Sequence, residues 1–420
     1  MSVRFTGVAR EVRRLPSGAT LLLEPRADAA TAAAVWRLEV GSRDEPERIA
    51  GVSHALEHLA FKGFEDLDAA ALNRRVDELG ARINAYTAED RTAVYGSVLP
   101  ERLDALLDLL GGMLRPSLRP ADVEVERKVI LEEIAMAEDD PESRAADLAA
   151  AFAFGEHPMG RPILGSAESV TELTVEDLRG WARDRWTADR LTVAVSGRFD
   201  AEAGEDRVEE ATSALAVGRV ASTRVPRTAP PWCSGARRSA DRRFQRVYGA
   251  TLAPGVARDD PERIAAALLG RVLGEPGHGA LHWTLVDPGL ADQAGLEHDP
   301  GDGVGSFGGW FETDPGREDE VVERFLGELR AAQDTPIDRE AWRRAARTLA
   351  TDLALQAETP MGRAMELADV WTERGELDDP DVAVERVLTT APEAGEGLLA
   401  RRPFDDVALV ALGPPRQDAT

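Results

Sequence analysis

Two histidines and a glutamate lie within five residues of one another, as His54, Glu57 and His58. Side chains four positions apart share one face of a helix, so both imidazoles can bind one metal ion. Glu57 lies on the same side, where its carboxylate can reach a water molecule without binding the metal itself. The spacing predicts a zinc site with Glu57 as the general base. The alternative is a polar helix face with two histidines, which agrees poorly with the flanking Leu56 and Leu59.

Two imidazoles leave zinc short of a ligand, because hydrolytic zinc sites use three protein groups and a water position. The helical segment 120–139 offers acidic candidates. On a helical wheel, Glu126 and Glu133 fall within an apolar stripe, whereas Glu132 points elsewhere. The other members of the stripe are Val123, Val129, Ile130 and Ala137. A carboxylate in such a stripe is costly unless it is paired or metal-bound. Glu133 is therefore the predicted third ligand, and Glu126 the predicted supporting residue of the catalytic site. The alternative is an ordinary solvated acidic helix.

The composition excludes several other functions. A net charge of −26 disfavours nucleic acid and anionic membrane surfaces as partners. A single cysteine, Cys233, excludes an intramolecular disulfide framework and a cysteine-rich metal site. No apolar run approaches the roughly 18 residues that cross a bilayer, and the first 18 residues lack the apolar core of a secretory signal. We therefore expect a soluble, cytoplasmic protein.

The chain contains a diverged duplication. Residues 46–50 recur at 261–265, an offset of 215, and the strand-like run 191–197 matches 407–413 at an offset of 216. The length of 420 residues agrees with two or three folding units. The predicted parts are a metal-binding half at 1–216, a linker rich in Pro, Ser and Arg at 217–240, and a diverged second half at 241–420.

Strand-like runs and amphipathic helical segments occur in mixed order along the first half. Strands are expected at 31–40, 92–99 and 191–197, and helices at 47–62, 68–79, 101–114, 120–139 and 174–185. This mixture predicts an α+β fold in which helices cover a sheet.

The H-x-x-E-H motif, followed after 74 residues by Glu133, resembles the inverted zinc motif of the pitrilysin family, especially its two-domain bacterial branch similar to mitochondrial processing peptidase. Further resemblance lies in residues 15–18, 41–45, 51–63, 84–87, 126–133 and 157–165. The resemblance implies two similar α+β halves that close like a clam around a peptide, with zinc in one half only. The offset of 215 agrees, because it maps the three motif residues onto Leu269, Val272 and Leu273.

The same resemblance implies a substrate-binding strand at the edge of the sheet in the zinc half. The matching residues are Asn84, Ala85, Tyr86 and Thr87, which lead into the strand-like run 92–99. Pairing of main chains at a sheet edge binds an extended peptide with little demand on its sequence. The alternative is a turn and a strand with a structural role only.

The second half departs from the family's pattern. Active single-chain members carry an Arg and a Tyr there that hold the substrate, but Asp292 stands at the Tyr position and residues 281–292 contain no Arg. We therefore expect the zinc-bearing subunit of a heterodimer whose sister subunit supplies the Arg/Tyr pair; a homodimer is the alternative. His278 and His282, four residues apart, are a weaker second metal candidate.

The function predicted from the sequence is that of a zinc metalloendopeptidase that hydrolyses short or unfolded peptides. Removal of a leader from a precursor peptide and general peptide degradation agree equally well with the sequence. The alternative function is a non-catalytic scaffold or a peptide-binding subunit of a peptidase complex, which the missing Arg/Tyr pair favours. The intact H-x-x-E-H motif and Glu133 favour the enzyme.

Overall fold

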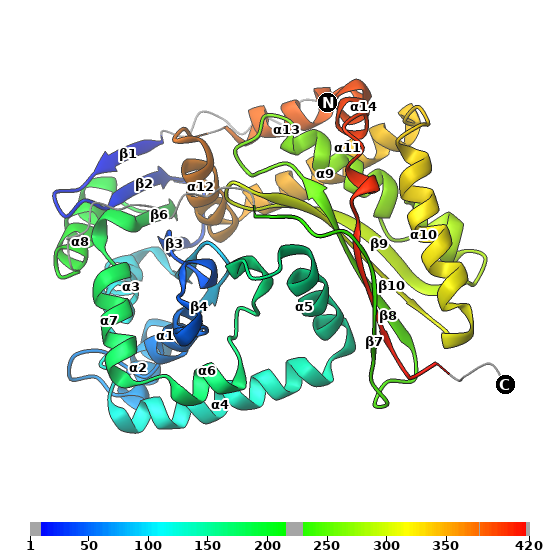
Figure 1. Ribbon diagram of the computed structural model, residues 1–420. Helices are drawn as coiled ribbons and strands as arrows, with labels where there is room; N and C mark the ends of the chain where they lie inside the picture. Colours follow the sequence, from blue (N-terminus) through cyan, green and yellow to red (C-terminus); the bar gives the residue numbers. More distant parts are fainter. Residues whose placement is uncertain (1–9, 216–229, 378, 417–420) are drawn as a thin grey trace. The chain divides into compact units, whose positions relative to one another are not determined.

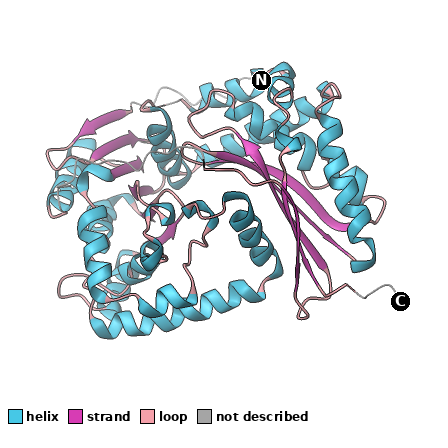
Figure 2. Cartoon of the chain, viewed as in Figure 1, coloured by secondary structure: helices cyan, strands magenta, loops and turns pink. Residues whose placement is uncertain are grey.

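The computed structural model describes residues 10–215, 230–377 and 379–416 (Figure 1). The chain divides into two compact units. Unit 1 comprises Met1–Ile134, Pro162–Pro226 and Leu353–Ala383, and unit 2 comprises Ala135–Arg161, Arg227–Asp352 and Val384–Thr420. Each unit contains one sheet with helices packed against it (Figure 2), which confirms the predicted α+β class. None of the described helices is long and apolar enough to cross a membrane.

The sheet of unit 1 has six strands in the order β1-β2-β6-β3-β5-β4. The strands are β1 (Glu11–Arg14), β2 (Thr20–Pro25), β3 (Ala32–Leu38), β4 (Arg82–Thr87), β5 (Thr92–Val98) and β6 (Leu191–Gly197). β2 and β6 are parallel, and all other neighbours are antiparallel. The strands expected at 31–40, 92–99 and 191–197 are thus confirmed. Among the described residues, β4 pairs only with β5 and forms one edge of the sheet.

The helices of unit 1 include most of those expected from the sequence. They are α1 (Val52–Ala60), α2 (Ala69–Leu79), α3 (Leu103–Met113), α4 (Pro120–Asp139), α6 (Ala167–Glu172), α7 (Val175–Arg185), α8 (Ala201–Ser213) and α12 (Pro360–Arg374). The expected helix at 47–62 is too long, because residues 47–49 form a separate 3₁₀ turn. α1 begins after Gly51, whose φ of +91° suits glycine. A Cβ there would lie 2.5 Å from the carbonyl oxygen of Leu164.

Helices cover both faces of this sheet. One face packs against α1, α3 and α7 in a large apolar core that contains the fully buried Trp36 of β3. The opposite face packs against α12, where Leu22 and Val35 of the sheet meet Ala364 and Leu367 of the helix. Because β3 is buried on both faces, its sequence is apolar almost throughout rather than alternating.

Unit 2 repeats the strand arrangement of unit 1. Its strands are β7 (Gly235–Ala240), β8 (Val247–Gly255), β9 (Ala291–Pro300), β10 (Gly305–Thr313) and β11 (Ala408–Gly413). Their order, β7-β11-β8-β10-β9, and their relative directions match those of β2-β6-β3-β5-β4. The structure therefore contains the duplication that the sequence repeats indicated. β7 occupies the end of the predicted linker 217–240, of which residues 217–229 lie outside the described part of the chain.

The helices of unit 2 extend the correspondence. They are α5 (Pro141–Phe154), α9 (Arg263–Gly274), α10 (Glu318–Ala332), α11 (Arg339–Glu358), α13 (Pro380–Thr389) and α14 (Pro392–Leu399). α9 follows β8 as α1 follows β3, and the long α11 corresponds to α4. α5 packs on β8 and β11 of unit 2, as α12 packs on the sheet of unit 1. The predicted bounds 1–216 and 241–420 remain a prediction, because the compact units combine separate stretches of the chain.

A buried ion pair fixes α12 to its sheet. Arg363 donates two hydrogen bonds, of 3.0 and 2.6 Å, to the carboxylate of Glu24 in β2, and both side chains are 2% exposed. Burial alone would raise the pKa of Glu24, but the hydrogen bonds and charges of Arg363 and Arg10 outweigh it and lower the pKa. The stabilisation is therefore present at neutral pH and is lost as the pH falls below the ordinary value of 4.5.

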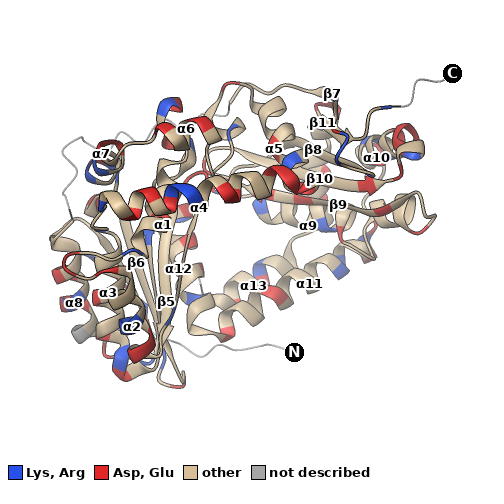
Figure 3. Ribbon diagram, turned by 90° about the horizontal axis from the view of Figure 1, so that it is seen from below, with Lys and Arg blue, Asp and Glu red and all other residues tan. Residues whose placement is uncertain are grey.

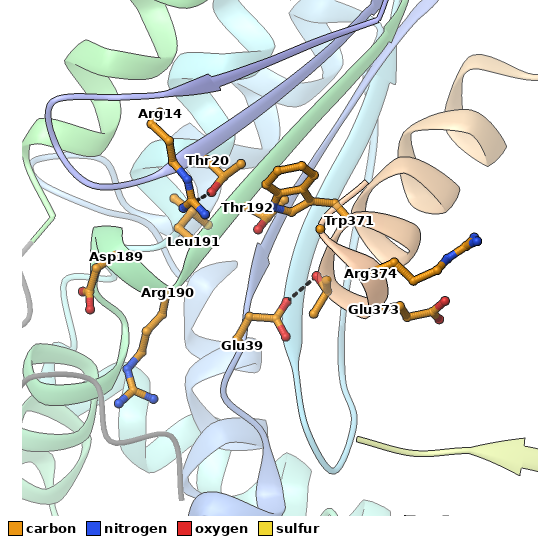
Figure 4. A pocket seen from close by; sticks show the side chains of 12 residues that line it. Arg14, Thr20, Glu39, Asp189, Arg190, Leu191, Thr192, Trp371, Glu373 and Arg374 are labelled. Atoms are coloured by element: carbon orange, nitrogen blue, oxygen red, sulfur yellow. Dashed lines mark hydrogen bonds between the residues drawn. The ribbon is translucent and has the colours of Figure 1, made fainter. Parts of the chain in front are cut away.

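The C-terminal end of α12 borders a cavity of about 480 Å³ in unit 1 (Figure 4). There the guanidinium of Arg14 lies 5.8 Å from the centre of the Trp371 ring. The hydroxyl of Thr372 donates a 3.0 Å hydrogen bond to Glu39, just beyond the end of β3. These contacts connect the end of α12 to the strands beneath it.

We predict that Arg363→Leu destabilises unit 1 by about 3–5 kcal/mol, because it leaves the buried Glu24 carboxylate without its main partner. Equilibrium denaturation by urea at pH 7 measures the loss. Arg183→Leu is the control, because Arg183 forms a solvent-exposed pair with Asp184 that contributes little to stability. Equal stability losses in the two variants would contradict the prediction.

Candidate metal centre

Helix α1 places His54 and His58 side by side. The start of the helix is fixed by Glu45, whose buried carboxylate accepts hydrogen bonds of 2.7 Å from the backbone N–H groups of Gly51 and Ser53. A carboxylate at this end also interacts favourably with the helix dipole. The two imidazole rings meet edge to face, with their centres 4.6 Å apart. The motif therefore places both histidines as the spacing predicted.

Glu133 of α4 joins the two histidines. Its Oε2 atom lies 3.2 Å from Nε2 of His58 and 3.8 Å from Nε2 of His54. A set of possible ligand atoms, one from each residue, lies within 4.8 Å of one another. The neighbouring Glu132 is exposed. Of the many acidic residues along α4 (Figure 3), Glu133 is thus the one that reaches both imidazoles.

The burial of α4 agrees with the predicted stripe only in part. Glu126 and Ile130 are buried as expected, but Val129 is 37% exposed and Ile134 is buried in its place. The helical wheel was wrong for Val129 because periodicity alone does not show which flank of a stripe meets the core. Arg127 anchors α4 by donating to backbone carbonyls at the end of α6, those of Val170 and Thr171, and to that of Leu173 just after it, at 2.7 Å.

Glu126 supports the histidine pair from behind. Its Oε2 atom lies 3.0 Å from Nδ1 of His58, while its Oε1 atom lies 2.5 Å from the ammonium of Lys62. Glu126 is only 5% exposed, so the ammonium compensates a charge that is shielded from water. A carboxylate on one imidazole nitrogen orients the other nitrogen toward a metal. The sequence interpretation missed Lys62, although its spacing of four residues from His58 was an available signal.

The protonation state of His54 suits a metal ligand. Burial, followed by the charge of His58, lowers the pKa of His54 to about 4, so its imidazole is neutral at pH 7 and has a free electron pair. Its Nδ1 atom is buried without a hydrogen-bond partner among the described residues. Glu133 has no Lys or Arg partner within the same described part of the chain. Two imidazoles and one carboxylate are a ligand set of hydrolytic zinc sites, so these residues fit a zinc ion.

Glu57 lies on the same helix as the histidines and contacts the sheet edge. Its Oε2 atom accepts a 2.7 Å hydrogen bond from the hydroxyl of Thr87 in β4. Burial raises the pKa of Glu57, and the Thr87 hydrogen bond opposes this effect without cancelling it. A carboxylate with a raised pKa exchanges a proton more readily near neutral pH, as a general base requires.

The four residues expected to bind substrate, Asn84 to Thr87, all lie in the edge strand β4. Ala85 belongs to the core on the α1 side and Thr87 points to Glu57, whereas Tyr86 packs on the opposite face with Tyr95. The outer edge of β4 has no strand partner within the described ranges. The structure thus places β4, the predicted substrate-binding strand, next to Glu57, the predicted general base.

The described residues of the second half contain no comparable cluster. Leu269, Val272 and Leu273 occupy α9, the counterpart of α1. Asp292 lies in β9 and forms an ion pair with Arg246. Within residues 10–215, 230–377 and 379–416, His54, His58 and Glu133 form the one group of three or more residues suited to a metal ion. His278 and His282 do not belong to such a group.

Comparisons with known proteins also distinguish the two halves of the chain. Residues 20–167 match the family model described as insulinase (peptidase family M16), and residues 172–349 match the model described as peptidase M16 inactive domain. An uncharacterized zinc protease of Mycobacterium tuberculosis is 42% identical over 44% of this chain and 43% of its own length. The match thus spans less than half of that relative.

Two longer similarities cover most of the chain. The mitochondrial-processing peptidase subunit beta of Caenorhabditis elegans is 28% identical over 83% of this chain and 77% of its own length. The crystal structure of a protease from Helicobacter pylori matches 97% of this chain and all of its own chain, with a TM-score of 0.87 and 20% identity. The latter similarity establishes the fold alone.

We predict that Lys62→Met weakens zinc binding about 10-fold, the lower end of the range for residues that support metal ligands. Without the ammonium, Glu126 loses its cationic partner and holds His58 less firmly. Competition with a fluorescent zinc chelator measures the affinity. Lys128→Met is the matched control, because Lys128 is an exposed residue of α4. Identical zinc affinities in the two variants would show that Lys62 does not support the site.

Proposed function

The chain belongs to peptidase family M16, and on this premise we propose that it is a zinc-dependent endopeptidase for short or unfolded peptides. The observation that carries the proposal is the convergence of His54, His58 and Glu133 from two helices. A zinc ion held there would activate a water molecule and polarise the carbonyl of the scissile peptide bond. The remaining chemistry belongs to residues of this chain.

Glu57 is the proposed general base. Its carboxylate takes a proton from the attacking water and later gives it to the amine that leaves the cleaved bond. The Thr87 hydroxyl holds one carboxylate oxygen through the 2.7 Å hydrogen bond, which limits the rotation of the side chain. The raised pKa of Glu57 supports its capacity to hold that proton between the two steps.

The edge strand β4 is the proposed substrate-binding strand. An extended peptide that pairs with Asn84 to Thr87 would be positioned by its main chain, next to the residue that holds Glu57. Such pairing requires an extended segment and therefore excludes folded proteins. The proposed substrates are precursor peptides with leaders as well as other short peptides. The proposed compartment is the cytoplasm.

We also propose that the chain acts as the zinc-bearing subunit of a heterodimer. Asp292 is engaged by Arg246 and is negatively charged, so it does not replace a Tyr as a hydrogen-bond donor to the substrate. A sister subunit with the Arg/Tyr pair would supply the missing contacts. The complete set of site residues in unit 1 supports an enzyme rather than a scaffold.

Glu57→Gln should retain zinc and lower the rate of peptide hydrolysis by about 10²–10⁴, because glutamine accepts no proton. The assay is the cleavage of an unfolded peptide followed by mass spectrometry, with zinc content measured on the same samples. Glu132→Gln, at an exposed position of α4, is the control and should keep full activity. Near-normal cleavage by the zinc-loaded Glu57→Gln variant would refute the assignment of the base.

The heterodimer proposal predicts that the purified chain cleaves peptides slowly and that a sister subunit with the Arg/Tyr pair raises kcat/KM. The measurement compares the chain alone, the sister alone and an equimolar mixture. The mixture should exceed the sum of the separate activities. Full activity of the chain alone, unaffected by the sister subunit, would contradict the heterodimer proposal.

A further inference from the structure

Unit 2 is hollow at the position that corresponds to the metal centre of unit 1. Leu269, Val272 and Leu273, the counterparts of the H-x-x-E-H residues, all line a cavity of about 400 Å³. The opposite side of this cavity includes Ala341 and Arg344 of α11, the counterpart of α4. Where unit 1 brings together ligands for a cation, unit 2 therefore has apolar side chains around an open space.

A second cavity, of about 430 Å³, adjoins the first. The two cavities share Val272, His278, Ala341 and Arg344. Residues three and four apart on a helix lie on one face, so Ala341, Arg344, Ala345 and Thr348 form one stripe of α11 that faces α9. The size of each cavity falls within the range of small-ligand sites, which is roughly 300–1,000 Å³.

The lining of the second cavity contains more arginines than acids. Arg271, Arg344 and Arg347 line it, against one lining acid, Glu275. Arg271 is paired with Glu275 at 3.3 Å and with Asp352 at 2.7 Å. Arg344 lies 3.6 Å from Glu340, and Arg347 has no acidic partner among the described residues. In a chain with a net charge of −26, Arg347 and the weakly paired Arg344 favour an anionic group beside an apolar floor.

The first cavity provides the apolar end of the site. Trp283 lines it and is 56% exposed, an unusual state for so large an apolar ring. The acids at this end are Glu328, which accepts a 2.9 Å hydrogen bond from Thr284, and Asp338. Because the acids lie at this end and the unpaired arginine at the other, an anionic ligand has one preferred direction.

We propose that these two cavities bind the C-terminus of a peptide whose last residues are apolar. The terminal carboxylate lies between Arg344 and Arg347, and the apolar side chains lie over Leu269, Leu273 and Trp283. Guanidinium groups bind carboxylates through short, charge-assisted hydrogen bonds. The choice of a peptide over other apolar carboxylates rests on the proposed function; the site itself is independent of the metal centre.

The test is calorimetric titration of the full-length Glu57→Gln variant with the peptide acetyl-Gly-Gly-Ser-Leu-Leu, as the free acid and as the C-terminal amide. The free acid should bind about 10- to 100-fold more tightly than the amide, the ratio expected for hydrogen bonds to a charged group. Adding Arg344→Gln and Arg347→Gln should abolish this preference. Arg339→Gln with Arg343→Gln is the matched control on the same helix and should preserve it.

Two further measurements separate this site from the metal centre and from other ligands. Ala341→Trp should fill the shared part of the cavities and abolish binding of both peptides, while zinc removal by a chelator should leave the affinities unchanged. Equal affinities for acid and amide, or a preference that survives the Arg344/Arg347 change, would overturn the proposal. Loss of peptide binding after zinc removal would also overturn the proposal. Binding of decanoate without binding of the peptide would refute the assignment of a peptide as the ligand.

Discussion

A buried carboxylate held between an ammonium and an imidazole is the constraint on which the candidate site depends. Glu126 lies under the surface of unit 1, with Lys62 on one oxygen and His58 on the other. Because a buried charge requires partners at hydrogen-bonding distance, α1 and α4 have little freedom to slide past each other. The same register brings Glu133, seven residues farther along α4, to the free side of the imidazoles. The contacts of Glu126 thus fix both the orientation of the His58 ring and the register of α4 against α1.

The two units show that this fold does not require the site. Both contain five strands in the same order and directions, and α9 and α11 of the second unit correspond to α1 and α4 of the first. Helix and strand pack closely in the second unit: a Cβ at Gly274 of α9 would lie 2.0 Å from the backbone nitrogen of Leu296 in β9. Yet the residues that correspond to the two histidines, Leu269 and Leu273, are leucines that line a cavity. The duplication therefore preserved the backbone framework while the chemistry between two of its helices changed.

Local signals in the sequence were enough to predict much of unit 1. Helix α4 begins and ends where its periodicity begins and ends, and α7 is capped by Thr174, whose hydroxyl accepts from the N–H of Asp177. The convergence of the candidate metal ligands was predictable because helical spacing and the cost of a carboxylate in an apolar stripe are both local properties. The edge strand required the family resemblance, since β4 alternates weakly and its position depends on β5.

Features set by distant contacts were not predictable in this way. The late start of α1 depends on the approach of Leu164 to Gly51, more than a hundred residues away in sequence. The packing of α12 against the sheet of unit 1 depends on the Arg363–Glu24 pair, which joins residues from the two halves of the chain. The role of Lys62 becomes visible only once Glu126 is known to be buried. Periodicity carries no information about partners of this kind.

The central claim is that His54, His58 and Glu133 bind one zinc ion. The most direct test is a crystal structure of the zinc-loaded protein with anomalous diffraction recorded on both sides of the zinc absorption edge. We predict a single strong anomalous peak bonded to the two imidazoles and the Glu133 carboxylate, at distances of about 2.0–2.2 Å. A peak bonded to other residues, or no peak between α1 and α4 in protein shown to contain zinc, would contradict the account.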